Sequence, residues 1–386
     1  MKPLQYLIVG VVGIAVFSSG MLAGYYQIPP SEELKSYLKP LMKSKNIITS
    51  EIYDNENRIS ERISLYSETD VKQKRSEMIN YIWMGSGLPT KYPEIDADVQ
   101  IKNFSDIQSL QKIDKFTVSM DFGENENKFL QSRESDMFSI SYLFHAKNPK
   151  KTLIIYHQGH GEESISDDKN IIKIFLDEGY SVLVFSMPAR EENNEPIVDT
   201  QRFGRLKLST HNHFQIIDNE YFHPIKFFLE PITVTLNYVE KQTDYENIHM
   251  LGLSGGGWTT VVYSALDPRI SQSYSVAGAF PMYMRDKNNL GDYEQTISEF
   301  YSIVNYEELF VMSGFGHGRK STQIFNYNDP CCFQAEVYEK SPYEEIINKK
   351  LSDLGSGEFR VVLDRSAKTH EISNFALKTI ISEIEN

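Results

Sequence analysis

Cysteine is scarce in this chain, which has two in 386 residues. Cys331 and Cys332 are adjacent, so they cannot build a disulfide framework that ties distant segments together. Because a free cysteine behaves as a small apolar side chain, we expect both to pack in the interior. There are two alternatives: the two cysteines form a disulfide that acts as a redox gate, or their two thiolates form half of a metal site. Stability must then come from a core, which 40% hydrophobic residues can fill.

Basic charge is also in short supply. The chain has 39 Lys and Arg residues against 53 Asp and Glu residues, a net charge of -14, and no long basic stripe. Proteins that bind phosphate backbones concentrate Lys and Arg, so this balance argues against nucleic acid as a partner and disfavours polyanionic substrates. Internal repeats and long low-complexity tracts are absent from the sequence as well, and its length suffices for one large α/β domain with an appendage.

A long hydrophobic run occupies the N-terminus, at residues 4–25. About 20 helical residues cross a bilayer, so the run predicts a single transmembrane anchor within residues 1–28. A signal peptide cleaved near Ser18 and Gly20 is the alternative and would give a secreted protein, but apolar residues resume at Met21. Lysines at positions 35–45, just after the run, favour a cytoplasmic location for the rest of the chain. The short basic segment before the run is instead typical of secretory signals and signal anchors, so we expect the rest of the chain to lie on the extracytoplasmic side.

The segment Gly252-Leu253-Ser254-Gly255-Gly256 lies between an apolar run, Ile248–Leu253, and a helical pattern, Gly257–Leu266. A serine at such a strand-to-helix turn needs small neighbours, which glycine supplies because it lacks a Cβ. The turn lifts the hydroxyl clear of the sheet, so Ser254 is the predicted nucleophile. The N–H of Gly255, at the start of the helix, is placed to donate to a developing oxyanion.

Further apolar runs around this turn predict strands. Six are typical of buried parallel strands: Thr152–His157, Ser181–Ser186, Ile248–Leu253, Tyr274–Ala279, Gln323–Asn328 and Phe359–Leu363. Helical patterns separate several of them, which predicts a mostly parallel sheet with helices on both faces. Ahead of them, Phe116–Phe122 and Met137–Ala146 alternate apolar and polar residues, as an antiparallel pair at a sheet edge does.

The Ser254 turn and this order of strands resemble the α/β-hydrolase fold over residues 116–386. The resemblance implies a catalytic triad in the chain order Ser, Asp or Glu, His, and no cofactor. His370 follows the last predicted strand and precedes a terminal helical pattern, Ile372–Ile384, whereas the other eight histidines come before the last two strands. We therefore expect His370 to be the general base.

The resemblance places the acid after the penultimate strand, where Asp329 follows Asn328 and Pro330 stops the strand. Asp364 and Glu371 are alternatives closer to His370 in sequence. Asp364 would more naturally cap the loop that it begins, and Glu371 would point away from His370 on a helical continuation. We expect Asp329 to orient His370.

The second oxyanion donor is expected in the loop after Thr152–His157, which reads Gln158-Gly159-His160-Gly161. If Gly159 matches the glycine of the family, the donor is the N–H of His160. A shift of one or two residues would make it Gly159 or Gln158.

Histidine spacing raises a metal hypothesis, because His157 and His160 are three residues apart and His211 and His213 two apart. Metal sites usually add a cysteine or carboxylate in a defined framework, and His157 lies at a strand exit, so we expect no metal. The glycine-rich segment 314–318 comes too late in the chain for a dinucleotide site, and we expect it to be a flexible loop near the active-site edge of the sheet.

Three segments lie outside the alternation of strands and helices. Residues 29–115 are rich in Lys, Glu, Ser and Tyr, show a helical period at Val71–Met84, and form either a stalk or a cap packed on the core. The polar, aromatic-rich stretches Pro188–Pro224 and Met284–Glu308 are expected to roof a substrate pocket.

The resemblance implies a serine hydrolase that cleaves a carboxylic ester through an acyl intermediate on Ser254, with a small-molecule, lipid or carbohydrate ester as substrate. The apolar run at residues 4–25 adds the expectation that this hydrolase is anchored in a membrane. A peptidase or thioesterase would use the same triad. Two hypotheses come from other classes: a non-catalytic binding protein on this fold, and a metal-dependent hydrolase that uses His157, His160, His211 and His213.

Overall fold

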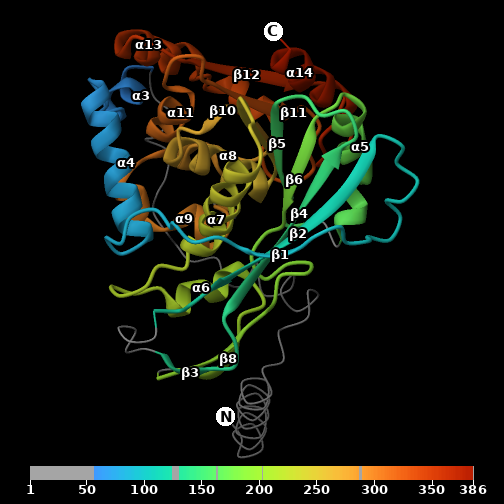
Figure 1. Cartoon of the computed structure of the whole chain (residues 1–386). Helices are drawn as coiled ribbons and strands as arrows, with labels where there is room; N and C mark the ends of the chain where they lie inside the picture. The colour runs from blue at the N-terminus through green and yellow to red at the C-terminus, as the bar shows by residue number, and fades with distance from the viewer. Residues whose placement is uncertain (1–55, 124–129, 162–163, 202, 287–288, 386) are drawn as a thin grey trace, which may run out of the picture. The chain divides into compact units, whose positions relative to one another are not determined.

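The computed structural model describes residues 56–385 except 124–129, 162–163, 202 and 287–288. These described residues belong to one compact unit. In it, nine strands form one sheet in the order β1-β2-β4-β6-β5-β9-β10-β11-β12, and β3, β7 and β8 form a small second sheet. Figure 1 shows the large sheet passing through the unit with helices against both faces. The predicted mostly parallel sheet covered by helices is confirmed.

The strands of the large sheet fall into an antiparallel edge and a parallel remainder. Neighbours from β6 to β12 pair in parallel, whereas β1, β2, β4 and β6 pair antiparallel. The edge pair predicted from alternating residues is β2 with β4. The bounds are β1 Glu94–Asp96, β2 Leu110–Met120, β3 Leu130–Arg133, β4 Met137–Ala146, β5 Thr152–His157, β6 Ser181–Phe185, β7 Ile197–Thr200, β8 Gly204–Lys207, β9 Asn247–Leu253, β10 Ile270–Val276, β11 Lys320–Asn326 and β12 Glu358–Asp364.

Helices connect these strands and cover the sheet. Helices α7, α8 and α11 pack on one face, and α5 and α14 pack on the other (Figure 1). The bounds are α3 Glu56–Arg62, α4 Glu68–Ile82, η1 Ile165–Asp168, α5 Lys169–Asp177, α6 His211–Ile217, α7 Lys226–Gln242, α8 Gly255–Leu266, η2 Met282–Met284, α9 Tyr293–Thr296, α10 Ser298–Ile303, α11 Tyr306–Gly314, α12 Ala335–Lys340, α13 Glu344–Leu354 and α14 Asn374–Ile384. The helices predicted after Ser254 and at the C-terminus are α8 and α14.

Two strands begin earlier than their apolar runs, Tyr274–Ala279 and Gln323–Asn328. Both β10 and β11 contain polar side chains that are buried, such as Ser273 and Ser321, each 1% exposed. The hydroxyls of Ser321 and Ser313 lie 2.9 Å apart as a hydrogen-bonded pair. Apolar periodicity cannot mark a strand whose buried positions are polar, because it assumes that the interior is apolar.

The glycine-rich segment 314–318 lies at the amino ends of the parallel strands, whereas the sequence predicts it at the carboxyl ends, near the active site. It leads into the amino end of β11, and a Cβ added to Gly314 would lie 2.5 Å from the carbonyl oxygen of Glu358, where β12 begins. The prediction was wrong because a loop that enters a parallel strand lies at the amino end, whereas ligands bind at the carboxyl ends. Arg319 stabilises this edge by donating to the carbonyls of Ser264 and Ile270.

The part of residues 29–115 that the structure describes packs on the core. Helix α4 covers most of the period predicted at Val71–Met84 and contacts α8 and α10. Lys74 forms an ion pair with the buried Glu308 at 2.8 Å, and Arg75 donates to the carbonyl of Ala265. From residue 56 onward, the described part of this region therefore belongs to the same compact unit as the sheet.

The predicted anchor at residues 4–25 and residues 29–55 lie outside the described residues. Within the described part of the chain, every helix is too short or too polar to cross a membrane.

Candidate active site

Ser254 occupies a strained turn between β9 and α8. Its backbone has φ 56° and ψ −120°, a region that residues with a Cβ rarely adopt. The flanking glycines are required by contact: a Cβ on Gly252 would lie 2.2 Å from the carbonyl oxygen of Gly256, and a Cβ on Gly256 would lie 2.1 Å from that of His157. The sequence prediction of a tight turn with small residues on both sides of the serine therefore matches the geometry.

His370 and Asp329 form a hydrogen-bonded pair. Nδ1 of His370 lies 2.7 Å from Oδ2 of Asp329, whose side chain is fully buried. The other carboxylate oxygen accepts from the N–H of Cys331 at 2.7 Å, which fixes the carboxylate plane. Because a carboxylate only accepts, the proton of a neutral His370 sits on Nδ1 and leaves Nε2 as a base. Nε2 is buried and has no hydrogen-bond partner among the described residues.

Sheet register brings the three predicted triad positions to one edge. Leu253, Val276, Ile324 and Val362 are aligned across β9, β10, β11 and β12. Ser254, Asp329 and His370 all follow the carboxyl ends of these strands, which is where ligands bind in open α/β sheets. The structure thus gathers at one edge the residues that the sequence nominated separately.

Asn326 holds the loop that carries His370, a role that sequence reasoning missed. Its buried side-chain amide donates to the carbonyls of Thr369 at 3.3 Å and Glu371 at 2.8 Å, the residues on either side of His370. An asparagine at the end of a strand has no sequence signature that separates this role from ordinary turn formation.

The two alternative acids have other partners. Asp364 is fully buried and accepts from the backbone N–H groups of Ser366 and Ala367 and from the Ser373 hydroxyl, so it caps the loop as the sequence suggested. Glu371 accepts from the N–H of Lys368. Asp329 is therefore the carboxylate that the structure pairs with His370.

The predicted oxyanion loop packs directly on the Ser254 turn. Gly255 opens α8, where the first N–H groups lack helical partners. In the loop after β5, the Gln158 N–H donates to the carbonyl of Phe185 at 2.9 Å, so it is not available to a substrate. Of the three backbone donors considered, Gly159 and His160 remain. The Gln158 side chain is buried and donates to Asp168 at 2.7 Å, which stabilises the loop.

The four histidines of the metal hypothesis do not form one group. His157 is buried beneath the turn, its Nδ1 contacts the Gln158 carbonyl, and burial lowers its pKa to about 4. His213 accepts from the N–H of Ser209. His160 and His211 do meet, with 2.9 Å between Nε2 of His160 and Nδ1 of His211.

The adjacent cysteines differ from the expectation of buried free thiols. Cys331 and Cys332 are joined by a disulfide, and Cys331 is exposed to solvent. The prediction of two buried free thiols was wrong because the turn after Asp329 leaves Cys331 in solvent, while Cys332 is partly buried against the core. The bond joins neighbours, so it still ties no distant segments together.

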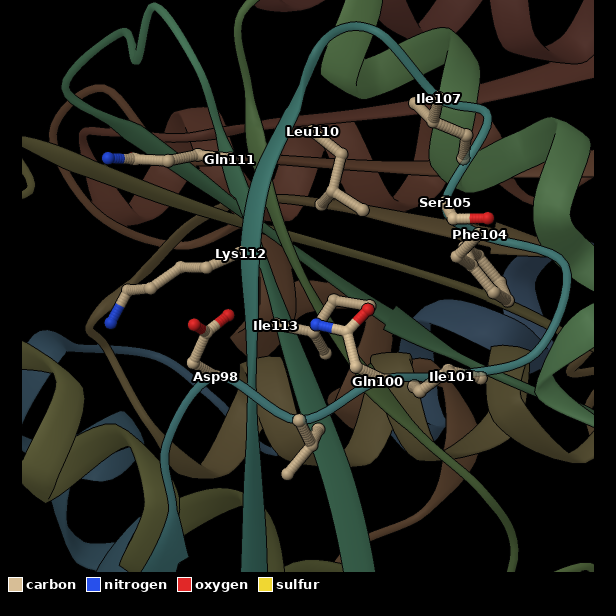
Figure 2. Close-up of a pocket in the computed structure, with 11 residues that line it drawn as sticks. Asp98, Gln100, Ile101, Phe104, Ser105, Ile107, Leu110, Gln111, Lys112 and Ile113 are labelled. Atoms are coloured by element: carbon tan, nitrogen blue, oxygen red, sulfur yellow. The ribbon is translucent and has the colours of Figure 1, made fainter.

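A hollow lies at the antiparallel edge of the sheet, away from the candidate active site. Figure 2 shows its lining side chains, among them Asp98, Phe104 and Lys112, around the first residues of β2. Ser254, Asp329 and His370 do not line it. We therefore assign it no part in the chemistry.

Comparisons with known proteins agree with this geometry at the level of the fold. Neither protein-family models nor curated proteins match the chain. Among solved structures, Methylesterase BT1017 aligns at 13% identity and a TM-score of 0.54, covering 90% of this chain and 65% of its own. An acetyl xylan esterase from Paenibacillus sp. R4 aligns at 14% identity and 0.53, covering 86% of this chain and 99% of its own. The predicted α/β-hydrolase fold is therefore confirmed, and this chain spans about two thirds of the methylesterase.

Proposed function

We propose that this chain is a serine hydrolase that cleaves carboxylic esters. The observation that carries the proposal is the hydrogen bond between the buried carboxylate of Asp329 and His370, on the same sheet edge as the strained turn at Ser254. A buried carboxylate that fixes an imidazole with a free Nε2 is the arrangement that activates a serine hydroxyl. Structural likeness to proteins named as esterases supports the same chemistry.

In the proposed mechanism, Nε2 of His370 takes the proton of Ser254 as its Oγ attacks the ester carbonyl. The leaving alcohol then receives that proton, and water hydrolyses the acyl-serine by the reverse sequence. Asp329 keeps the imidazole in the required tautomer and stabilises its positive charge. The N–H of Gly255, with that of His160 or Gly159, stabilises the oxyanion, each donor lowering the barrier by about 3 kcal/mol. These steps need no cofactor.

We propose a short acyl or methyl ester as the substrate, carried on a carbohydrate or another small molecule. Side chains crowd the Ser254 turn: a Cβ on Gly255 would lie 2.3 Å from the ring of His160 and 2.6 Å from the methyl group of Met187. These contacts require a glycine at position 255, beside the oxyanion loop. The names of the two similar structures, a methylesterase and an acetyl xylan esterase, support this class.

A substrate panel tests the proposal on the purified full-length chain. Aryl esters of graded acyl length, aryl thioesters and peptide amides are compared, with fluorophosphonate labelling in parallel. We expect labelling of Ser254 and the fastest turnover on acetyl esters. Faster turnover of thioesters or amides would reassign the leaving group. Absence of both labelling and turnover would support a non-catalytic binding protein on this fold.

We also propose that residues 4–25 anchor the protein as a single span with the catalytic unit outside the cytoplasm. The near-continuous apolar run supports retention, and the short basic start supports this orientation. The full chain should stay with membranes through alkaline carbonate washing, and added protease should reach the catalytic unit from the extracytoplasmic side. A mature N-terminus near Met21 would instead indicate a secreted enzyme.

A further inference from the structure

A second constellation of side chains lies beside the oxyanion loop. It consists of His160, His211, Asp292 and Glu294, here called the four-ligand cluster, and its ligand atoms all lie within 4.8 Å of one another. Nε2 of His160 is 3.2 Å from Asp292 and 3.3 Å from Glu294, and Nδ1 of His211 is 3.2 Å from Glu294. His211 and Glu294 are buried, at 1% and 0% side-chain exposure.

A count of protons shows that neutral rings cannot satisfy this cluster. Nε2 of His211 lies 2.9 Å from the carbonyl of Pro188, which only accepts, so a neutral His211 has no proton on Nδ1. The single proton on Nε2 of a neutral His160 would then be the only donor for three acceptors, which are Nδ1 of His211 and the carboxylates of Asp292 and Glu294. Oε2 of Glu294 is buried and receives no hydrogen bond among the described residues, although it faces His211. Either both rings are protonated, or a cation lies between the four groups.

We propose that the four-ligand cluster binds one divalent transition-metal ion, with zinc as the first candidate. Imidazole nitrogens and carboxylate oxygens are both zinc ligands, and ligands about 2.0 Å from a tetrahedral zinc ion lie about 3.3 Å apart. Four contacts between ligand atoms, at 2.9–3.3 Å, match that spacing. Magnesium and calcium prefer sites made of oxygen alone, so the two imidazoles argue against them.

The surroundings of the cluster are those of a supported metal site. The Pro188 carbonyl fixes the His211 ring with Nδ1 toward the cluster, and a backbone carbonyl in this role is a common feature around metal-bound histidine. Oδ1 of Asp292 accepts from the amide of Asn212 at 3.3 Å, which leaves Oδ2 for the ion. Four protein ligands close the coordination shell, which is typical of structural zinc and leaves no position for catalysis.

The site would join three segments that are far apart in sequence. His160 belongs to the oxyanion loop, His211 opens α6 in the insertion 188–224, and Asp292 and Glu294 lie at the start of α9 in the insertion 284–308. A bound ion would hold both insertions to the loop that packs on Ser254. If the proposed hydrolase function holds, the ion also positions one oxyanion donor, because His160 supplies both a ligand and a backbone N–H.

Metal analysis of the full-length chain, purified in detergent without a polyhistidine tag, tests the proposal. We expect about one zinc ion per chain after dialysis. Replacement with Co²⁺ should give the visible absorption of a tetrahedral cobalt site. Both signals should be lost in Glu294→Gln and in Asp292→Asn, whose half-exposed side chain makes misfolding a small risk.

The matched control is His213→Gln, on the same helix as His211 but bonded to Ser209, and it should keep the ion. A folded wild-type chain that holds no stoichiometric metal, and whose melting temperature does not rise with added Zn²⁺ or Co²⁺, would overturn the proposal in favour of a doubly protonated ion-pair cluster. Equal metal content in wild type, Glu294→Gln and Asp292→Asn would do the same. These readouts do not involve ester turnover, so they are separate from a failure of the hydrolase proposal.

Discussion

The carboxyl-end edge of the sheet that carries the predicted triad Ser254, Asp329 and His370, here called the triad edge, and the four-ligand cluster both gather residues that are distant in sequence. They are built differently. Ser254, Asp329 and His370 each follow the carboxyl end of a parallel strand, and the ladder from β9 to β12 sets their positions. The cluster takes its ligands from one loop and two insertions, whose positions depend on side-chain packing. Strand pairing fixes where residues at the ends of neighbouring strands lie, even when they are far apart in sequence. Residues in insertions are positioned only by the side-chain contacts that the insertions make.

The largest expected effect is the loss of the nucleophile at the triad edge. Ser254→Ala should abolish fluorophosphonate labelling and lower kcat for an aryl acetate by about 10⁴–10⁶-fold, because no other group supplies the acyl intermediate. The exposed Ser302 provides the control, and Ser302→Ala should keep both signals. Turnover that survives in Ser254→Ala would show that the triad edge is not the catalytic site.

The second prediction separates the two carboxylates near His370. Asp329→Asn should lower kcat by about 10⁴-fold, because an amide favours the wrong imidazole tautomer. Asp364→Asn should leave most of the turnover but lower the free energy of unfolding by about 2 kcal/mol, because the amide cannot accept all the hydrogen bonds that the buried carboxylate receives. Steady-state kinetics and urea unfolding measure the two effects. The reverse ranking would transfer the orienting role to Asp364.

The sequence nominates the three predicted triad residues by two routes. Ser254 has a local signature, a glycine-rich turn between a strand and a helix, whereas Asp329 and His370 follow from the order of strands in the family that the chain resembles. Asn326 was missed because its hydrogen bonds reach residues more than 40 positions away, with no local pattern. The starts of β10 and β11 were misplaced because their buried side chains are polar.

The four-ligand cluster could not be predicted for a related reason. The histidine spacing suggested a metal site that includes His157 and His213. In the structure, His157 is buried and contacts the carbonyl of Gln158, and His213 accepts a hydrogen bond from the N–H of Ser209, just before α6. The carboxylates that complete the cluster lie about 80 residues beyond His211. Such spacing has no period, so only tertiary structure brings these groups together.

A third prediction measures how far the cluster supports the triad edge. Asp292→Asn should lower kcat by about tenfold, the usual scale for groups that support a site without touching the reacting atoms. Fluorophosphonate labelling of Ser254 should persist at a reduced rate. A loss as large as that of Asp329→Asn would mean that the cluster takes part in the chemistry.

The smallest expected effect concerns a histidine placed by a strand. Burial lowers the pKa of His249 on β9 to about 4 from its usual value of 6.5, so the folded chain keeps the ring neutral. As the pH falls below 6.5, the unfolded chain gains a proton that the folded chain refuses, and stability is lost progressively down to the folded pKa. The contribution is about 2 kcal/mol between about pH 7.5 and pH 5.

Urea unfolding of wild type and His249→Leu at the two pH values measures that contribution. The variant should lose less stability on acidification than the wild type, and its ester turnover near neutral pH should change little. An identical loss in both proteins would show that His249 is not the group that titrates.

The most direct test of the proposed function is to trap the acyl intermediate. The full-length enzyme is mixed with an aryl acetate, quenched in acid during turnover, digested and analysed by mass spectrometry. The proposed mechanism predicts one acetyl group on the peptide that contains Ser254, formed within a burst of aryl alcohol and absent from Ser254→Ala. Turnover without any acyl group on Ser254, or an acyl group on a different residue, would contradict it.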